Sequence, residues 1–285
     1  MICHNSVGYD AQIKDLLIKS AFNMDEKEID VWMKYQYDPH HMFCFWQDDK
    51  ITSCLQITKR NMMFLDQQMR VSVISIAATL PDYRQRKQFS NLLDAAISQA
   101  THNDLLTITY TNMPKLFESK SFQHISNTKE YWIGAPLCRS GNPFHIKQKA
   151  KNLYPLYFQF MQYFDGSILL SEDEFDQLIQ YHQNLGKSIV TIINEDKQPK
   201  GFAIYSTKEN QAHVEVLVYF DSQAIQDLLS YLSINNEVTS ILISESERFD
   251  KLFPLHFPRT DKKLMVRLNN YKLFDKFSNT NVRNA

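Results

Sequence analysis

Three cations lie close together in the segment RQRKQF: Arg84, Arg86 and Lys87. The ten residues before Pro81, VSVISIAATL, are apolar and β-branched, which is typical of a buried strand, and Pro81 ends strand pairing because it has no N–H to donate. After the cations, apolar residues recur at helical spacing: Phe89, Leu92, Leu93, Ala96, Ile97 and Ala100. The free N–H groups of a helix N-terminus, its dipole and three cations together favour an anion such as phosphate. The alternative interpretation is a solvated basic turn.

The composition limits the classes of function. The 285 residues allow one or two domains, and 31 Lys and Arg residues against 32 Asp and Glu residues give a formal net charge of −1. A nucleic-acid partner is therefore not expected, and any polyanion site must be local. Only 6 residues are glycine, although close approach of a backbone to a ligand usually uses glycine.

The sequence also predicts the compartment. The N-terminal segment MICHNSVGYD has neither the basic nor the apolar region of a signal peptide, and no apolar run approaches the roughly 20 residues that cross a bilayer. The four cysteines show no CxxC spacing, so we expect reduced thiols in a cytoplasmic protein without a metal site or a membrane partner.

The first half of the chain alternates helices with hairpins. An amphipathic helix is expected over 10–21, and a second helix should begin at Asp25, with Glu28 completing a capping box. Two hairpins follow, around Asp-Asp and near Asp66, and then the strand, loop and helix described above. A buried strand LLTITY, a short segment MPKLFESKSF and a strand QHISNTKEYWIG complete this half. One strand–helix–strand crossover within a mostly antiparallel sheet predicts an α/β (α+β) fold.

The second half repeats this order of elements without repeating the residues. A helix, the hairpin of SIVTII and GFAIYS, the strand HVEVLVYF, another helix and the strands VTSILIS and LMVRL follow one another. We expect a first domain over 1–135, a linker helix region over 136–165 with clustered aromatic residues, a second domain over 166–278 and a tail over 279–285.

The two predicted strand-to-helix junctions differ in charge. In the second half the junction reads YFDSQAIQ, where Asp221 and Ser222 are good N-cap residues and no basic residue is nearby. A carboxylate there would repel phosphate. The sequence therefore predicts an anion site in the first half only.

The combination of a strand, Pro-x-x-Arg-x-Arg, an amphipathic helix and a second buried strand resembles motif A of the GNAT acyl-CoA N-acyltransferases. The segments AHVEVLVYF, DLLSYLSINNEV and LMVRLNNYKLFDKF look like the second, degenerate domain of the Eis-like members of that family. This resemblance covers roughly residues 5–277. It implies two tandem GNAT-like domains, each with a mixed, mostly antiparallel sheet flanked by helices. It also implies acetyl-CoA as cosubstrate, a small-molecule or peptide amine as acceptor, and association into homo-oligomers.

The family pattern assigns site residues by position. In the family, the strand before the loop pairs with the pantetheine arm of CoA, which points to Ala77, Ala78 and Thr79. The loop that wraps the CoA pyrophosphate corresponds to Arg84, Gln85, Arg86, Lys87, Gln88 and Phe89. The family has small residues where this chain has Lys87 and Phe89. If the loop needs a positive φ at Lys87, a residue other than glycine costs on the order of 1–2 kcal/mol there. The Lys87 ammonium would offer a point charge to phosphate, and Phe89 fits the apolar stripe of the helix.

The proton-transfer residues of the family are also changed. Eis-like enzymes have a tyrosine where LFESKSF places Phe117, and a phenyl ring has no proton to give. Tyr110 and Tyr131 are the candidate substitutes for this acid, and structural packing is the alternative role for both. No carboxylate or histidine lies in the strand before Pro81, so the amine would lose its proton to water. Asp82 is expected only to cap the turn, and the pair His40–His41 lacks the neighbours of a metal site.

These observations leave two main hypotheses for function. The first is an acetyl-CoA-dependent N-acetyltransferase that acts on an unidentified primary amine. The second is a catalytically degenerate tandem-GNAT protein that acts as a binding or regulatory module. A FemAB-like enzyme that uses aminoacyl-tRNA is disfavoured by the near-neutral charge. Full Eis-like chains continue into a sterol-carrier-like domain whose terminal carboxylate enters the active site, and we expect no such role for Ala285.

Overall fold

The computed structural model describes residues 1–20, 24–138, 140–148, 152–272 and 274–275. It divides into two compact units. Unit 1 comprises Met1–Ile125, Asp165–Leu170 and Leu264–Ala285, and unit 2 comprises Ser126–Phe164 and Ser171–Lys263. Two long strands, β6 (Gln123–Gly134) and β13 (Arg259–Leu268), contribute residues to both units. The expected tail over 279–285 lies outside the described residues.

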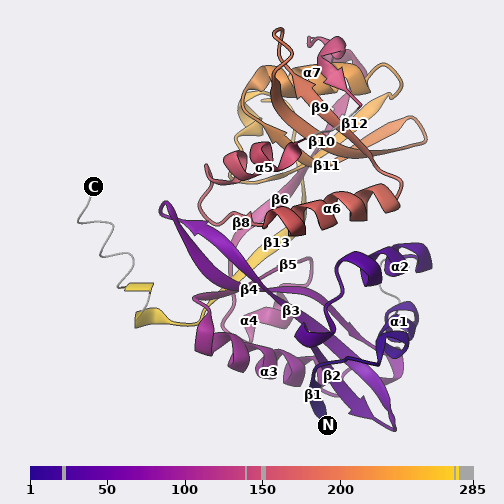
Figure 1. The fold of residues 1–285 in the computed structure, drawn as a ribbon, viewed down its shortest axis with the longest axis vertical. Helices are drawn as coiled ribbons and strands as arrows, with labels where there is room; N and C mark the ends of the chain where they lie inside the picture. The colour runs from indigo at the N-terminus through magenta and orange to yellow at the C-terminus, as the bar shows by residue number, and fades with distance from the viewer. Residues whose placement is uncertain (21–23, 139, 149–151, 273, 276–285) are drawn as a thin grey trace. The chain divides into compact units, whose positions relative to one another are not determined.

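Unit 1 is built on five strands in the order β1-β2-β3-β4-β5, with β8 beside β3 (Figure 1). The strands are β1 (Ile2–His4), β2 (Met42–Gln47), β3 (Lys50–Phe64), β4 (Gln67–Thr79), β5 (Leu106–Thr111) and β8 (Ile168–Leu169). The helices are α1 (Asp10–Lys19), α2 (Glu26–Tyr35), α3 (Gln88–Asn103) and α4 (Lys115–Glu118). The two hairpins turn at the expected places, and β4 and β5 form the one parallel pair among these strands. The α/β fold predicted for the first half is confirmed.

The core of unit 1 forms because α3 has a continuous apolar stripe. Leu92, Leu93, Ala96 and Ala100 are fully buried against β2, β3 and β4. The capping box of Asp25 and Glu28 begins α2 as the sequence predicts, with each side chain accepting from the backbone N–H of the other residue at 2.8 Å. The sequence pattern did not predict β1 or β8, because strands of two or three residues are too short to show the alternation of apolar and polar residues that is typical of a strand.

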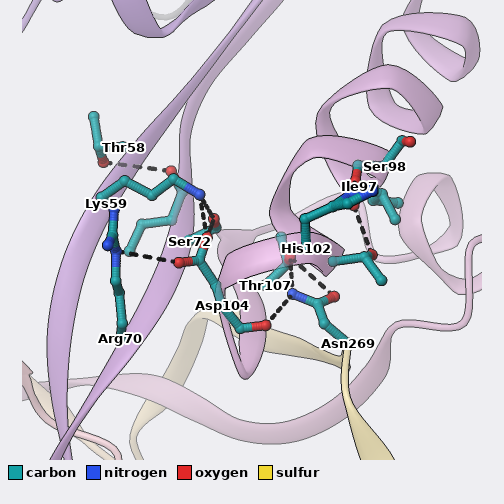
Figure 2. A network of polar contacts seen from close by, with 12 residues as sticks. Thr58, Lys59, Arg70, Ser72, Ile97, Ser98, His102, Asp104, Thr107 and Asn269 are labelled. Atoms are coloured by element: carbon teal, nitrogen blue, oxygen red, sulfur yellow. Dashed lines mark hydrogen bonds and ion pairs between the residues drawn. The ribbon is translucent and has the colours of Figure 1, made fainter.

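The beginning of β4 and β5 is fixed by a buried carboxylate (Figure 2). Asp104 follows α3, its side chain is fully buried, and it lies between Lys59 of β3 and Ser72 of β4. The Ser72 hydroxyl donates to Asp104 at 2.5 Å, and Arg70 Nε lies 3.4 Å from the other carboxylate oxygen. This network ties the end of α3 to the start of both strands. It lies at the end of the strand pair opposite to the loop after β4.

Unit 2 repeats the arrangement with different residues. Its strands run in the order β6-β12-β11-β10-β9-β7, and β11 and β12 are parallel. They are β7 (Ile146–Lys147), β9 (Ser188–Ile193), β10 (Pro199–Lys208), β11 (Gln211–Tyr219) and β12 (Val238–Ser244), together with the unit 2 part of β6. The helices are α5 (Leu153–Met161), α6 (Glu172–Asn184) and α7 (Ser222–Leu232). Because β10, β11, α7 and β12 match β3, β4, α3 and β5 in order and direction, the predicted repeat of one fold is confirmed.

Candidate functional site

The strands β4 and β5 separate halfway along their length. Their parallel pairing begins at Val71 opposite Leu106 and ends at Ile74 opposite Thr109, although β4 continues to Thr79 and β5 to Thr111. A bulge in β4 lies at the same level, since Ile74 and Ile76 face consecutive residues of β3 and Ser75 is left without a partner there. Beyond the bulge, the edge of β4 that faced β5 is open. This opening is the centre of the candidate site.

The backbone groups at this open edge follow from the register. The N–H of Leu80 donates to the carbonyl of Thr52 at 3.0 Å, and hydrogen-bonded pairs alternate along an antiparallel ladder. The N–H and C=O of Ala78 therefore point toward β3, whereas those of Ala77 and Thr79 point toward the edge that β5 has left. Ala77 and Thr79 were both predicted as pantetheine-strand residues. The structure places Ala78, the third of them, with its backbone on the closed side.

The loop after β4 adopts the conformation that glycine would favour. Gln85 and Lys87 have φ of 61° and 60°, and Lys87 is the N-cap of α3 in the left-handed region. Each non-glycine residue in this region costs on the order of 1–2 kcal/mol. The positive φ that makes a residue other than glycine costly at Lys87 is therefore present.

The N-terminus of α3 is open to an anion. No side chain caps it, and within the described chain the N–H groups of Gln88, Phe89 and Ser90 have no acceptor. The side chain of Gln88 does not serve as a cap because it is buried, where it accepts from Thr52 at 3.0 Å and donates to Gln47 at 3.0 Å. Three N–H groups at the positive end of a helix dipole are a suitable site for phosphate oxygens.

The three cations of the loop are engaged differently. Arg84 turns back to the backbone: it donates to the carbonyl of Ser20 at 2.5 Å and lies 3.4 Å from that of Thr79. Arg86 lies over the ring of Tyr83, 5.2 Å from its centroid. Lys87 is exposed, and no described residue pairs with its ammonium. Among the described residues, Lys87 is thus the one of the three cations whose charged group has neither a hydrogen bond nor a ring contact, and Arg86 has only the ring contact.

The aromatic residues considered as proton donors lie in different environments. Phe117 is buried and packs edge-on against Phe89 at 5.6 Å and Phe122 at 5.4 Å, so it is a core residue. Tyr131 is also a core residue, buried in unit 2. Tyr110 directly follows Thr109, at the opening between β4 and β5, and 45% of its surface is exposed. Partial burial of its phenol raises the pKa of Tyr110, so the group holds its proton at neutral pH.

One polar connection at the opening has no signal in the sequence. Gln56 is almost fully buried in β3, and its Nε2 donates to Oγ of the bulge residue Ser75 at 3.2 Å. Its Oε1 accepts from the N–H of Asp38 at 2.9 Å, and the carboxylate of Asp38 lies 2.6 Å from Nδ1 of His41. Gln56 thereby joins the bulge to the loop after α2. A glutamine in an apolar strand and a bulge without glycine give no pattern from which this could be expected.

The equivalent place in unit 2 is closed to an anion. The pairing of β11 with β12 also ends after four residues, at Val214 opposite Ile241, and β11 also bulges at the next position. Here, however, the carboxylate of Asp221 accepts from the N–H of Ala224 at 2.7 Å and caps α7. The ring of Phe249, only 1% exposed, packs against Tyr219. The predicted difference between the two junctions is therefore visible as an open and a capped helix, although Lys200 of β10, which is distant in the sequence, lies 3.8 Å from the Asp221 carboxylate, so a cation does lie near the second junction.

Neither a metal centre nor a membrane-spanning helix is found in the part of the chain that the structure describes. No three His, Cys, Asp or Glu side chains gather there as metal ligands. No helix there combines the length and apolar character needed to cross a bilayer.

Family models match both halves of the chain. Residues 11–124 match one model of an acetyltransferase (GNAT) domain, and residues 167–269 match another model of the same description. No curated protein is significantly similar in sequence.

Solved structures share the fold across nearly the whole chain. A probable N-acyltransferase from Enterococcus faecalis V583 is 14% identical with a TM-score of 0.78, over 94% of this chain and 72% of that one. Eis1 from Mycobacterium abscessus is 11% identical with a TM-score of 0.70, over 94% and 73%. A tandem GNAT protein from the clavulanic acid biosynthesis pathway is 9% identical with a TM-score of 0.58, over 95% and 98%. The chain belongs to the GNAT acetyltransferases and carries two of their domains in tandem, in the Eis-like manner.

Proposed function

We propose that the first GNAT domain, which the sequence places in residues 1–135, transfers the acetyl group of acetyl-CoA to a primary amine of a small molecule or peptide. One observation carries this proposal. The open edge of β4 leads directly to the uncapped N-terminus of α3, and unit 2 lacks that combination. Acetyl-CoA carries its thioester on a long arm that ends in phosphates. It therefore needs both a strand edge along which the arm can lie and free N–H groups that can bind the phosphates.

The residues present fit acetyl-CoA in two places. The N–H and C=O of Ala77 and the N–H of Thr79 are directed so that the amides of a pantetheine arm can pair with them as an added strand would, whereas the carbonyl of Thr79 already accepts from Nε of Arg84 at 3.4 Å. The pyrophosphate would then accept from the first-turn N–H groups of α3, with the Lys87 ammonium as a point charge. Arg84, by contrast, supports the loop through the carbonyl of Ser20. Lys87 is therefore the cation of this loop that would face the pyrophosphate.

The chemistry requires a proton for the leaving sulfur. The amine nitrogen attacks the thioester carbonyl carbon, a C–N bond forms, the C–S bond breaks, and the amine releases a proton to water. The departing thiolate takes its proton from the hydroxyl of Tyr110, which stands at the opening and is protonated at neutral pH. Phe117 cannot serve, because it has no proton and is enclosed in the core.

A second function has a specific observation in its favour. By the family resemblance, Phe117 stands where the family has a tyrosine, and two left-handed residues occupy the loop, as would be expected of a domain that kept the fold but lost turnover. Such a protein would bind acetyl-CoA as a binding or regulatory module. In that case the ligand would bind without a product.

The proposal is tested by incubating the full chain with acetyl-CoA and a set of amines, namely a polyamine, free lysine and a peptide with a free N-terminus. Mass spectrometry then detects the acetylated amine. We expect one class to be acetylated, and we expect Tyr110→Phe to lower the rate about 100-fold, while Tyr163→Phe, at an exposed tyrosine of unit 2, leaves it unchanged. Acetyl-CoA binding with no product from any amine would support the binding module instead.

We also propose that the enzyme works in the cytoplasm and self-associates. The four cysteines are all described and free, which fits a reducing compartment. Sedimentation of the purified chain would test the self-association.

A further inference from the structure

The strand opening of unit 1 begins with two hydroxyl groups, one on each strand. Ile74 and Thr109 are the last paired residues of β4 and β5, so Ser75 and Tyr110 are the first residues beyond the pairing. Both of these residues are exposed. The proposed acetyl transfer uses the hydroxyl of Tyr110 and leaves that of Ser75 without a role.

Ser75 is the extra residue of the bulge in β4. Its neighbours Ile74 and Ile76 face Ile57 and Gln56, which are consecutive residues of β3, and Ser75 itself faces no residue of that strand. Bulges often redirect a side chain next to a functional site. The Ser75 side chain is directed to Gln56, since its Oγ lies 3.2 Å from Nε2 of that residue.

The orientation of the Gln56 amide follows from its two other partners. Oε1 lies 2.9 Å from the backbone N–H of Asp38, which can only donate, and Nε2 lies 2.8 Å from the carbonyl of Gln36, which can only accept. The amide therefore cannot be turned around. Gln56 is 1% exposed, and the two hydrogens of Nε2 are used within the protein, one on Gln36 and one on Ser75.

This orientation decides the direction of the hydrogen bond at Ser75. Because an amide nitrogen only donates, Oγ of Ser75 must accept from Gln56, and the hydroxyl hydrogen of Ser75 is not used in this contact. No described residue accepts that hydrogen. Ser75 thus presents a hydrogen-bond donor at the opening, and a buried amide anchored on two backbone groups holds it in place.

Acetyl-CoA bound as proposed brings its thioester to this point, and the inference rests on that proposed function. The phosphates lie at the N-terminus of α3, and the arm then passes Thr79 and Ala77. The thioester is at the end of the arm farthest from the phosphates. Continued in the same direction along β4, the arm arrives at Ser75, where the opening ends.

Acetyl transfer gives such a donor a use. As the amine nitrogen attacks the thioester carbon, negative charge develops on the carbonyl oxygen, and the carbonyl forms again when the C–S bond breaks. A donor already aimed at that oxygen stabilises the charge without having to rearrange. The amine is not a suitable partner for this hydrogen, because a hydrogen bond to its lone pair would oppose the attack.

Unit 2 differs at the equivalent bulge. Glu215 is the extra residue of the bulge in β11, since the residues on either side of it face consecutive residues of β10. Its carboxylate lies 2.5 Å from Nζ of Lys187, and an ionised carboxylate can only accept. The donor at the bulge is therefore a feature of the first domain, in which the open N-terminus of α3 also lies.

We propose that Ser75 is a catalytic residue of unit 1, whose hydroxyl donates a hydrogen bond to the carbonyl oxygen of the acetyl thioester. Gln56 is a positioning residue, because its amide makes Ser75 an acceptor on one side and leaves the hydroxyl hydrogen for the thioester. Ser75 keeps its proton throughout the reaction. The proton that the departing sulfur takes comes from Tyr110.

The contact is tested in the full chain with acetyl-CoA that carries carbon-13 at the acetyl carbonyl. A hydrogen bond to the oxygen moves the carbonyl resonance downfield, so the wild-type complex should give a signal downfield of free acetyl-CoA. Ser75→Ala should return the signal toward the free position with little change in affinity, because the rest of the arm still binds. Ser98→Ala, at an exposed serine of α3, is the matched control and should give the wild-type signal.

Turnover separates a catalytic role from a structural one. Ser75→Ala should lower kcat about 100-fold and leave KM for the amine unchanged, as expected when a donor to a developing oxyanion is removed. Ser75→Thr keeps the hydroxyl and should retain most of the activity. Gln56→Glu should also lower kcat, because a carboxylate only accepts and would take the Ser75 hydrogen. Adding Ser75→Ala to Gln56→Glu should cost little more, since both changes remove the same hydrogen bond.

The outcomes distinguish this inference from the proposed function. A Ser75→Ala variant whose carbonyl resonance or kcat matched the wild type would overturn the role of Ser75 and leave acetyl transfer standing. Loss of the resonance shift in Ser75→Ala, with no product from the wild type and any amine, would support the contact and refute acetyl transfer. No binding of acetyl-CoA to the wild type would refute both. Because Ser75 is exposed, Ser75→Ala decides the matter even if Gln56→Glu fails to fold.

Discussion

Ile74 and Thr109 are the last residues at which β4 and β5 pair, and the hydroxyl of Thr109 donates to the carbonyl of Ile74 at 3.2 Å. Thr109 is 3% exposed, so this bond closes the strand pair from inside the core. This hydrogen bond gives the carbonyl of Ile74 a partner at the point where the two strands separate. The opening thus begins at a defined residue, because the last carbonyl before it has a side-chain partner.

Replacing Thr109 with valine tests this role. Thr109→Val keeps the shape of the side chain but leaves the carbonyl of Ile74 without its hydroxyl partner, which should cost about 1 kcal/mol of unfolding free energy. We also expect weaker acetyl-CoA binding. Urea denaturation measures the first effect, with Thr207→Val as control at an exposed position of β10. Equal losses in the two variants would show that the bond has no special role.

Because Lys87 is in the left-handed region, glycine at this position should change the free energy of unfolding. Lys87→Gly should raise the unfolding free energy by about 0.5–1 kcal/mol, because relief of the left-handed strain exceeds the entropy that glycine adds to the unfolded chain. Acetyl-CoA binding should nevertheless weaken through loss of the ammonium. Lys197 is the matched control, since it is also exposed with φ of 62° but lies in a turn of unit 2. Lys197→Gly should give the same stabilisation and leave acetyl-CoA binding unchanged. If both glycine variants lost acetyl-CoA binding to the same extent, Lys87 would have no specific role in it.

Much of the fold followed from the sequence because the long elements have clear periods. The apolar stripe of α3 and the β-branched run of β4 predicted a strand–helix crossover, and the structure confirms it. The N-cap role of Asp221 was also predicted correctly, and α3 is uncapped by contrast, but the sequence did not reveal that Lys200 lies 3.8 Å from the Asp221 carboxylate. These features are local, so sequence spacing alone reveals them.

What the sequence could not show depends on contacts between distant residues. The three cations of the loop look equivalent in RQRKQF, yet Arg84 binds the carbonyl of Ser20, far away in the chain. The bulge at Ser75 and its bond from Gln56 require the register of β3 against β4. Likewise, Ser75 and Tyr110 reach the same opening from two strands that α3 separates in the chain. Only the folded chain brings such residues together.

The buried carboxylate of Figure 2 predicts a large loss of stability. Asp104→Asn keeps the shape but removes the charge that faces Lys59, so a largely buried cation loses its counter-ion. We expect a loss of about 3 kcal/mol. The comparison variant is Asp94→Asn, which breaks the more exposed pair with Lys120 and should cost under about 1 kcal/mol. Denaturation of both variants in the same buffer makes the comparison, and similar losses would contradict the importance of burial.

A second buried carboxylate makes the free energy of unfolding depend on pH. Burial would raise the pKa of Asp227, but hydrogen bonds from Asn142, Gln223, His145 and Lys200 together lower it to about 2. An aspartate in the unfolded chain has a pKa near 3.9. The stabilisation is therefore complete above about pH 4 and is lost as the pH falls toward 2.

The loss of this stabilisation should be measurable as a fall in the free energy of unfolding at acidic pH. Between pH 5 and pH 2, wild-type unfolding free energy should fall by about 2 kcal/mol more than that of Asp227→Asn, which cannot titrate at this position. Asp196→Asn, at an exposed turn, should follow the wild type. Urea denaturation at stepped pH provides the values. A wild type and an Asp227→Asn variant with parallel curves would show that this carboxylate is not responsible.

Of the two similar strand openings, the one in unit 1 is proposed to bind acetyl-CoA and the one in unit 2 is not. Hydrogen exchange of the full chain, with and without acetyl-CoA, measures both openings in one molecule. We predict slower exchange at Ala77, Thr79 and the first turn of α3, and unchanged exchange at 215–224, where Asp221 caps α7. Lys87→Glu should remove the protection and Lys197→Glu should not. Equal protection of both openings, or of neither, would rule out selective binding of acetyl-CoA at the opening of unit 1.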